Sequence, residues 1–194
     1  MATASDTEDV ELLDANGETI GLTSQASVHG PDTPLHLAFS GYVFNARGEV
    51  LITRRASTRA RWPGVWSNSF CGHPAPAETL ASAVRRRAAY EVGLDLTGLE
   101  PALPLFRYRH LDRAHTSENE VCPIYVASTS QEPTVHPAEV MDHAWVDPLD
   151  LGRSIRLNPS IYGPWLVLQA QLLSFLGGSQ PRTAAPPQRE RERV

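Results

Sequence analysis

Residues 71–94 combine a Cys-Gly-His triplet with a predicted helix that carries charge on its apolar face. The helix is expected over Thr79–Val92, and Gly93 follows at the position where a glycine commonly ends a helix. One stripe of this helix is apolar: Leu80, Ala83, Val84 and Ala88. At about 100° per residue, Arg87 and Glu91 fall inside that stripe. The helix must therefore pack on a core while these two charges find partners, because an unpaired buried charge is costly.

The two inward charges allow two interpretations. In the first, Arg87 and Glu91 form an i,i+4 ion pair at the edge of the core, worth only about 0.2–0.5 kcal/mol. In the second, Glu91 faces a site that holds a cation or a phosphate. The spacing alone leaves both interpretations open.

The composition is that of one globular domain of 194 residues, of which 41% are apolar. We expect a flexible N-terminus over residues 1–9, a single domain over residues 10–178, and a disordered tail over residues 179–194. No apolar run reaches membrane-spanning length and no signal-peptide pattern is present, so we expect a cytoplasmic protein with no membrane partner. The net charge of −5 gives no indication of a nucleic-acid partner.

All 17 basic residues are arginine, and the two cysteines are Cys71 and Cys122. Anion binding must therefore use the planar guanidinium group rather than a lysine ammonium. Two separated thiols in a cytosolic chain favour neither a disulfide nor a thiolate zinc site. Cys122 lies among apolar residues, so we interpret it as a small buried side chain.

Turn signals and apolar runs predict hairpins and strands interleaved with two helices. Val10–Thr23 is expected to form a hairpin around Asn16-Gly17. Further strands are expected over Leu35–Phe44, Val50–Arg54, Leu105–His110, Glu120–Ala127 and His143–Val146. Trp165–Leu176 is predicted as a second helix, begun by Pro164 and ended by Gly177-Gly178. This order indicates an α/β (α+β) sandwich.

The segment around the first helix also resembles a known phosphate-handling signature. Gly72, Glu78, Arg86 and Glu91-Val92-Gly93-Leu94 have the spacing of the Nudix box. Nudix hydrolases carry Glu at the positions of Arg87 and Tyr90, and those carboxylates help to gather the divalent ions that drive diphosphate hydrolysis. An Arg repels such ions, and a Tyr removes a ligand. The resemblance therefore implies a Nudix scaffold that has lost the hydrolase site.

Five separated motifs resemble the type I isopentenyl-diphosphate isomerases. In chain order they are Leu35–Ser40, Trp62–Trp66, Asn68–Pro74, Phe106–Arg109 and Glu118–Pro123. The resemblance implies a Nudix-like mixed sheet sandwiched between helices, with an added N-terminal hairpin. It also implies conversion of isopentenyl diphosphate to dimethylallyl diphosphate in isoprenoid biosynthesis, by a metal-assisted 1,3-proton shift through a carbocation-like intermediate. The expected partner is this small-molecule isoprenoid diphosphate, bound by a monomer or a weak homodimer.

The same resemblance implies two divalent metal sites. The ligands of the first would be His29, His36, His73, Glu118 and Glu120. Glu118 and Glu120 are two residues apart, so on a strand they share one face. The resemblance suggests Mg²⁺ or Mn²⁺ at this site, with Zn²⁺ as an alternative that the ligand types also permit. A second ion, Mg²⁺, would bridge Glu91 and the substrate diphosphate.

The proton-transfer groups implied by the resemblance are Cys71 and Glu120. Moving a double bond needs one proton to arrive and another to leave, so two groups on opposite faces of the alkene are required. We assign protonation to Glu120, with Tyr108 hydrogen-bonded nearby, and removal of the other proton to Cys71. Trp165 matches an active-site indole whose face can stabilise a passing cation. From the sequence alone, the favoured interpretation of Trp165 is a core residue at the start of a helix.

Arg55, Arg59 and Arg87 are the candidate diphosphate ligands, because a bidentate guanidinium suits phosphate oxygens. The family usually has Lys at the positions of Arg59 and Gln25, and Gln25 cannot supply the second charge. Arg54 and Arg61 fit equally well as diphosphate ligands or as solvated loop charges, and Trp62, Trp66 and Trp145 are expected to pack. Two other functions stay open at this point, a Nudix diphosphatase and a non-catalytic binding protein on the same scaffold.

Overall fold

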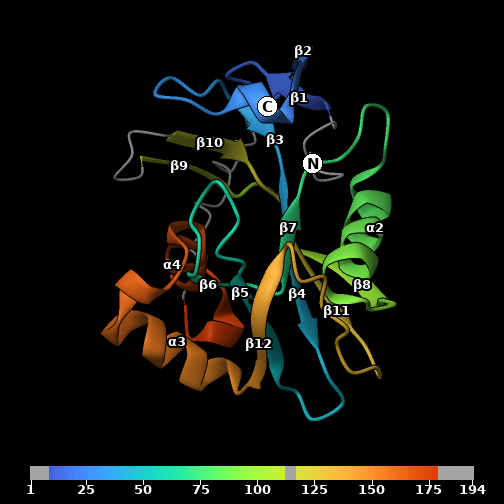
Figure 1. The fold of residues 1–194 in the computed structure, drawn as a ribbon, viewed down its shortest axis with the longest axis vertical. Helices are drawn as coiled ribbons and strands as arrows, with labels where there is room; N and C mark the ends of the chain where they lie inside the picture. The colour runs from blue at the N-terminus through green and yellow to red at the C-terminus, as the bar shows by residue number, and fades with distance from the viewer. Residues whose placement is uncertain (1–8, 112–116, 179–194) are drawn as a thin grey trace, which may run out of the picture.

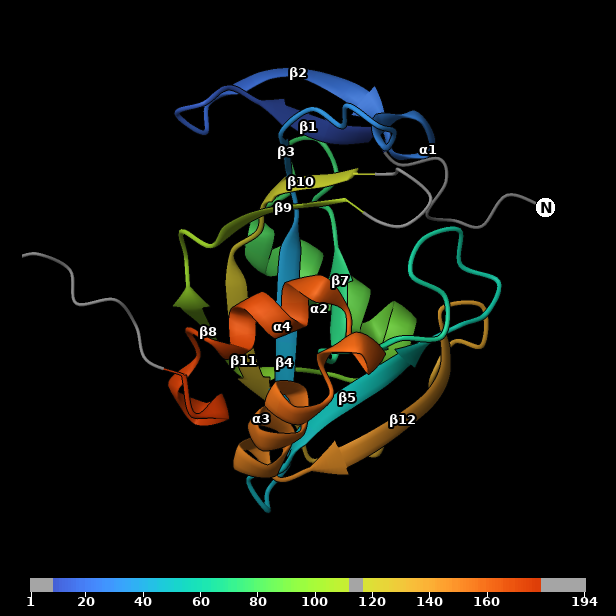
Figure 2. The same cartoon turned by 90° about the vertical axis from the view of Figure 1, so that its left-hand side faces the viewer.

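The computed structural model describes residues 9–111 and 117–178, which form two mixed β-sheets and the helices that cover them (Figures 1 and 2). The smaller sheet has the order β2-β1-β3-β10-β9. Its strands are β1 (Asp9–Leu13), β2 (Thr19–Ser24), β3 (His36–Leu37), β9 (Arg107–Leu111) and β10 (Ser117–Val121). The β1–β2 hairpin is the predicted N-terminal hairpin, and its turn contains Gly17 at a φ of 88°. The flexible segment expected over residues 1–9 lies, except for Asp9, outside the described residues, as does the predicted tail.

The larger sheet lies between helices, as the sequence predicts. Its order is β12-β5-β4-β11-β8, with β6 paired to β5 and β7 paired to β4. Its strands are β4 (Phe39–Phe44), β5 (Val50–Arg55), β6 (Trp66–Ser67), β7 (Phe70–Gly72), β8 (Thr97–Leu103), β11 (Ile124–Ser128) and β12 (Val140–Val146). Helix α2 (Leu80–Val92) covers one face, and α3 (Pro148–Leu157) and α4 (Pro164–Ala170) cover the other (Figure 1). A one-turn helix, α1 (Gln25–Val28), follows the hairpin.

Two predicted strands are each divided in two, because the chain there passes from the smaller sheet to the larger one. The expected strand Leu35–Phe44 is interrupted at Ala38, whose N–H donates to Val121 O at 2.9 Å. The expected strand Glu120–Ala127 is interrupted by Pro123, which has no N–H for a ladder hydrogen bond. Ser40 N donates to Pro123 O at 3.1 Å, so the two crossings run side by side. The end of one sheet and the start of the other therefore meet at a single junction.

The second predicted helix is shorter than Trp165–Leu176. The α-helix ends at Ala170, and the N–H groups of Leu172 and Leu173 both donate to Gln169 O at 2.9 Å. Tight turns of this kind commonly close a helix. A separate 3₁₀ turn then covers Ser174–Leu176, and another, Pro159–Ile161, precedes α4. The buried Gln169 side chain accepts from Tyr42 Oη at 2.6 Å, which fixes the end of the helix on the sheet.

Helix α2 agrees closely with its prediction. Thr79 Oγ1 accepts from Ser82 N at 3.2 Å at its start, and Gly93 ends it with a φ of 66°. Its apolar stripe packs against β4 and β5 in one of the two cores. Arg87 and Glu91 are buried in that stripe, with exposed fractions of 5% and 8%. None of the helices in residues 9–111 and 117–178 combines the length and apolar character that crossing a bilayer requires.

Candidate active site

A pocket opens at the junction of the two sheets, with an empty volume of about 620 Å³ that includes its mouth. It brings together residues from both sheets, from α2 and α4, and from the loop between β5 and β6 (residues 56–65). All the residues predicted for catalysis and substrate binding line it: Cys71, Tyr108, Glu120, Trp165, Arg55, Arg59 and Arg87. The predicted metal ligands His73, Glu91 and Glu118 line it as well. The pocket is therefore the candidate active site.

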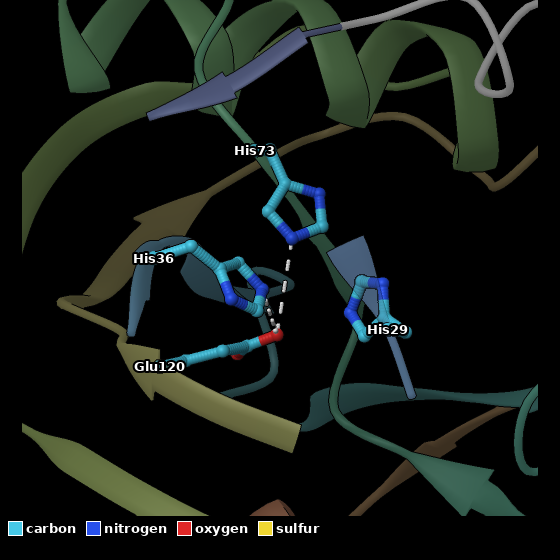
Figure 3. A group of neighbouring side chains, drawn as sticks. All are labelled: His29, His36, His73 and Glu120. Atoms are coloured by element: carbon cyan, nitrogen blue, oxygen red, sulfur yellow. Dashed lines mark ion pairs between the residues drawn. The ribbon is translucent and has the colours of Figure 1, made fainter. Parts of the chain in front are cut away.

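Three histidines and a glutamate form a compact cluster, of which His73 and Glu120 also line this pocket (Figure 3). His29 follows α1, His36 lies on β3, and His73 follows β7. Glu120 on β10 is the register partner of His36. One ligand atom from each of the four lies within 4.8 Å of the others. The sheet junction, rather than any local motif, therefore gathers the cluster.

The cluster fits a divalent metal ion. At ligand distances of about 2.1 Å, two donors on one ion lie at most roughly 4.2 Å apart, so small side-chain movements would suffice. His36 Nδ1 lies 3.0 Å from Pro34 O, which turns Nε2 towards Glu120 Oε1 at 3.6 Å. Within the described residues, buried ring nitrogens lack a hydrogen-bond partner: His36 Nε2, His29 Nδ1 and both nitrogens of His73. Buried polar atoms are normally satisfied, so these orphaned nitrogens indicate a missing ligand.

The charge states in the cluster also suit a cation. Burial lowers the pKa of His73 to about 4, so this imidazole is neutral and keeps a free lone pair. Burial alone would raise the pKa of Glu120, but the imidazoles of His36 and His73, at 3.6 and 3.8 Å from Glu120 Oε1, outweigh it and hold that pKa well below its ordinary value. Burial would likewise lower the pKa of His36, but Glu120 reverses the direction and raises it. The site thus offers a carboxylate and imidazoles, the ligand types expected there.

Glu118, the fifth predicted ligand, lies beside the four-residue cluster. Its Oε2 is 3.1 Å from His29 Nε2, and its Oε1 accepts from Arg61 Nε at 3.1 Å. The sequence leaves open whether Arg61 is a solvated loop charge or a ligand for the diphosphate. Its side chain is 21% exposed and lines the pocket. Arg61 and Glu118 are 57 residues apart, so no sequence spacing could have paired them.

Cys71 sits between two fixed hydrogen-bonding groups. Its Sγ donates to Asn68 Oδ1 at 3.2 Å and lies 3.5 Å from Ser40 Oγ. Asn68 is fully buried, and its Nδ2 donates to Gly41 O and Phe70 O, which keeps Oδ1 turned towards the thiol. Burial raises the pKa of Cys71 to about 11, although the hydrogen bonds that the thiol shares with Ser40 Oγ and Asn68 Oδ1 act in the opposite direction. Neither Ser40 nor Asn68 was predicted to support the thiol.

The aromatic residues close the inner end of the pocket. Trp165 is 5% exposed, and its Nε1 donates to Asn68 Oδ1 at 2.9 Å. Trp165 thus combines the two interpretations that the sequence left open, since it packs in a core and also lines the pocket. Tyr108 is the register partner of Glu120, and burial raises its pKa well above the ordinary value. Trp62 was expected only to pack, yet it lines the pocket with its ring centroid 6.2 Å from that of Trp165.

Four arginines, called the arginine wall below, line the pocket: Arg55, Arg59, Arg61 and Arg87. Burial lowers the pKa of Arg55 to about 10, which still leaves it cationic at neutral pH. Its guanidinium donates to Arg61 O and lies 5.5 Å from the Trp165 ring centroid. Arg87 Nη2 lies 2.5 Å from Glu91 Oε1, so the predicted i,i+4 ion pair is present. Both members of that pair also line the pocket, so the two interpretations of this charge pair are compatible.

Comparison with known proteins gives one family match and many similar sequences. Residues 34–166 match the NUDIX domain family. A protein of Agromyces mediolanus named isopentenyl-diphosphate Delta-isomerase is 58% identical over 175 residues, which are 90% of this chain and 85% of that protein. A protein of Escherichia coli with the same name is 46% identical over 164 residues, 84% of this chain and 90% of that protein.

Solved structures agree on the fold. A protein from Deinococcus radiodurans has a TM-score of 0.65 at 19% identity and covers 83% of this chain and 96% of its own. A MutT protein from Methanosarcina mazei Go1 has a TM-score of 0.55 at 16% identity and covers 74% of this chain and 91% of its own. At these identities the likeness concerns the arrangement of sheets and helices alone.

Proposed function

Because this chain belongs to the NUDIX family and to the isopentenyl-diphosphate Delta-isomerases within it, we propose that the pocket at the sheet junction carries out that reaction. The enzyme converts isopentenyl diphosphate to dimethylallyl diphosphate, a step of isoprenoid biosynthesis. The observation that carries the proposed site is one pocket lined by Cys71, Glu120 and Trp165 together with an arginine wall. The proposed proton-transfer groups and the proposed anion-binding groups thus line one pocket.

The arginine wall would bind the diphosphate. Arg55, Arg59 and Arg87 offer guanidinium groups that can bond phosphate oxygens in pairs. Arg61 adds a fourth cation on the same wall, where Gln25 is uncharged. Among the described residues, Arg61 contacts Glu118 through Nε alone, so its two terminal nitrogens are available to an anion.

The alkene would lie deeper, between Cys71 and Glu120. We assign delivery of the proton to Glu120, assisted by Tyr108, and removal of the other proton to Cys71. To act as the base, Cys71 must first release to water the thiol proton that it donates to Asn68 Oδ1, and Ser40 can then donate to the thiolate. The Trp165 indole faces the same pocket and can stabilise positive charge that develops on the substrate. Burial of this end excludes water from a reactive cation.

The metal-binding residues would be His29, His36, His73 and Glu120, with Glu118 joining them from the side of His29. When bound, a divalent ion there, Mg²⁺ or Mn²⁺ with Zn²⁺ as an alternative, would supply positive charge that tunes the acidity of Glu120. We assign Glu91 to a second Mg²⁺ that binds together with the diphosphate. In the chain itself, Pro34 O and the β3–β10 register hold His36 and Glu120 in position.

A diphosphatase on this scaffold is disfavoured by two side chains of α2. Arg87 lies where a hydrolase has a metal-binding Glu, and its guanidinium carbon is 5.1 Å from the Tyr90 ring centroid. Tyr90, at the other substituted position, stacks on His136 with ring centroids 4.7 Å apart. Arg87 and Tyr90 thus contact other side chains and supply no carboxylate ligand for a divalent cation.

The test is to incubate the purified protein and Mg²⁺ with isopentenyl diphosphate and to follow formation of dimethylallyl diphosphate by NMR. The expected result is dimethylallyl diphosphate without release of phosphate. Folded protein with measured metal content that forms none of this product would overturn the proposal. Release of phosphate or pyrophosphate would instead identify a hydrolase. Cys71→Ala should abolish turnover while pyrophosphate binding is retained, which separates an isomerase from a binding protein.

A further inference from the structure

Glu139 is a buried carboxylate that the proposed mechanism does not use, although it contacts two of the proposed diphosphate ligands. Its side chain is 2% exposed. Its Oε2 accepts from Arg59 Nη1 and lies 3.7 Å from Arg87 Nη2. Its Oε1 is buried and has no hydrogen-bond partner in the described part of the chain. Burying a carboxylate with one unpaired oxygen costs free energy unless nearby cations offset the loss of hydration.

The backbone around Glu139 holds it in a fixed place. His136 N donates to Glu91 O, and Thr134 N donates to Val92 O, each at 2.9 Å, so the segment before Glu139 is bonded to the end of α2. On its other side, Ala56 N donates to Glu139 O at 2.9 Å, at the start of the 56–65 loop. Glu139 therefore bridges the helix that carries Arg87 and the loop that carries Arg59.

The charges alternate across this bridge. Arg59 contacts Glu139, Glu139 lies near Arg87, and Arg87 is paired with Glu91. Two guanidinium groups on one pocket wall repel each other, and a low-dielectric setting strengthens that repulsion. Arg87 has Glu91 as a counter-charge on its own helix, whereas Arg59 comes from a loop and is 19% exposed. Among the described residues, Glu139 is the carboxylate in ion-pair contact with Arg59, so without its charge only Glu91, beyond ion-pair distance, offsets the repulsion between Arg59 and Arg87.

We propose that Glu139 is a positioning residue that holds Arg59, together with Arg87, in the geometry that receives the substrate diphosphate. It does not touch the reacting atoms. Its effect is to order the arginines before the anion arrives, which reduces the entropy lost on binding. This inference rests on the proposed function for the identity of the substrate, but the binding of pyrophosphate can be measured without turnover.

Glu139→Gln keeps the size of the side chain and removes its charge. We expect the dissociation constant for inorganic pyrophosphate with Mg²⁺, measured by calorimetry, to rise about tenfold, with a similar rise in KM and a change in kcat below about threefold. Arg59→Ala should weaken binding to a similar degree. If Glu139 acts through Arg59, adding Glu139→Gln to Arg59→Ala should cause little further loss. Independent, multiplying effects of the two substitutions would overturn the proposal, as would unchanged or tighter binding by Glu139→Gln.

Two further variants keep the test decisive. Glu139→Asp retains the buried charge but withdraws the carboxylate by one methylene, so it can be measured even if Glu139→Gln does not fold. It should give a dissociation constant above that of the wild type, and a wild-type value would contradict the proposal. Glu49→Gln is the matched control, because Glu49 pairs with Arg47 at an exposed turn outside the pocket. Wild-type protein that binds pyrophosphate but forms no dimethylallyl diphosphate would count against the proposed function. The role of Glu139 would then be decided by the dissociation constants for pyrophosphate alone.

Discussion

Arg61 Nε donates to Glu118 Oε1 at 3.1 Å, while Oε2 of the same carboxylate lies 3.1 Å from His29 Nε2. Arg61 thereby turns one oxygen of Glu118 towards the histidine cluster. A residue that hydrogen-bonds to a metal ligand holds that ligand in position, and its loss typically weakens metal binding by about 10–100-fold. The contact joins the 56–65 loop to the predicted metal site.

We therefore predict that Arg61→Ala weakens binding of Mn²⁺ about tenfold, because Glu118 loses its fixed orientation. Calorimetric titration of metal-free protein would measure the affinity directly. Arg47→Ala, which removes an exposed arginine far from the pocket, should bind Mn²⁺ as the wild type does. If removal of the Arg61 charge instead tightens Mn²⁺ binding, repulsion between the guanidinium and the ion dominates, and the positioning role is wrong.

A labelling experiment can decide which group delivers the proton. In D₂O, Cys71→Ala should retain the donor, Glu120, and lack the group that removes the other proton. Reversible protonation of the alkene would then place deuterium in the terminal =CH₂ group of the recovered isopentenyl diphosphate, without formation of dimethylallyl diphosphate. NMR of that recovered substrate measures the exchange. Unlabelled substrate would contradict the assignment and would point to the thiol as the donor, a role consistent with its raised pKa.

The sequence predicts most of the elements that have strong local signals. The α2 periodicity and Gly93 predict that helix, and Asn16-Gly17 predicts the first turn. Strand β8 was missed, because Pro101 argues against a strand, although Pro is tolerated at the sheet edge where β8 lies. Helix α3 was also missed, despite an Asp147 cap and a Pro at its first position, the signals typical of a helix start.

Most of the remaining site depends on the sheet junction, which local sequence patterns do not define. The crossing at Ala38 continues the apolar pattern of its strand, and Pro123 marks a break in the second strand without indicating that the chain changes sheet. Contacts such as Arg59 with Glu139 join residues 80 positions apart. The metal, thiol and arginine residues were found only because five motifs resemble a known family. The residues that position them, Asn68, Arg61 and Glu139, required the structure.

The raised pKa of Cys71 predicts how the thiol responds to pH. Burial places this pKa at about 11 in the metal-free protein, above the value of about 8.5 for a free cysteine. At pH 8 the thiolate fraction is therefore lower, and alkylation by iodoacetamide should be roughly tenfold or more slower than for a free thiol. The rate should keep rising between pH 9 and pH 11. Mass spectrometry of chelator-treated protein, with Cys71→Ser to report on Cys122, measures this profile, and a plateau near pH 8 would contradict it.

Glu78 and Arg86, two residues of the Nudix box, form hydrogen bonds that are expected to stabilise the fold. Substitution of Glu78 therefore tests their contribution to the free energy of unfolding. Arg86 Nε and Nη2 donate to the Glu78 carboxylate at 3.0 and 2.8 Å, and Glu78 Oε2 also accepts from Ala75 N at 2.9 Å. We predict that Glu78→Gln lowers the free energy of unfolding by about 1 kcal/mol at pH 7, a modest value because Arg86 is partly exposed.

The pH dependence of that loss follows from the direction of the pKa shift. The Arg86 hydrogen bond is the largest influence and lowers the pKa of Glu78 below its ordinary value. A carboxyl group with a lowered pKa in the folded state stabilises the protein above its unfolded pKa, and the stabilisation disappears as the pH falls through the folded pKa. The difference between the wild type and Glu78→Gln should thus be constant from pH 6 to pH 8 and shrink below about pH 4. Urea unfolding at several pH values measures it, and a difference that persists undiminished at low pH would show that the carboxylate charge does not contribute.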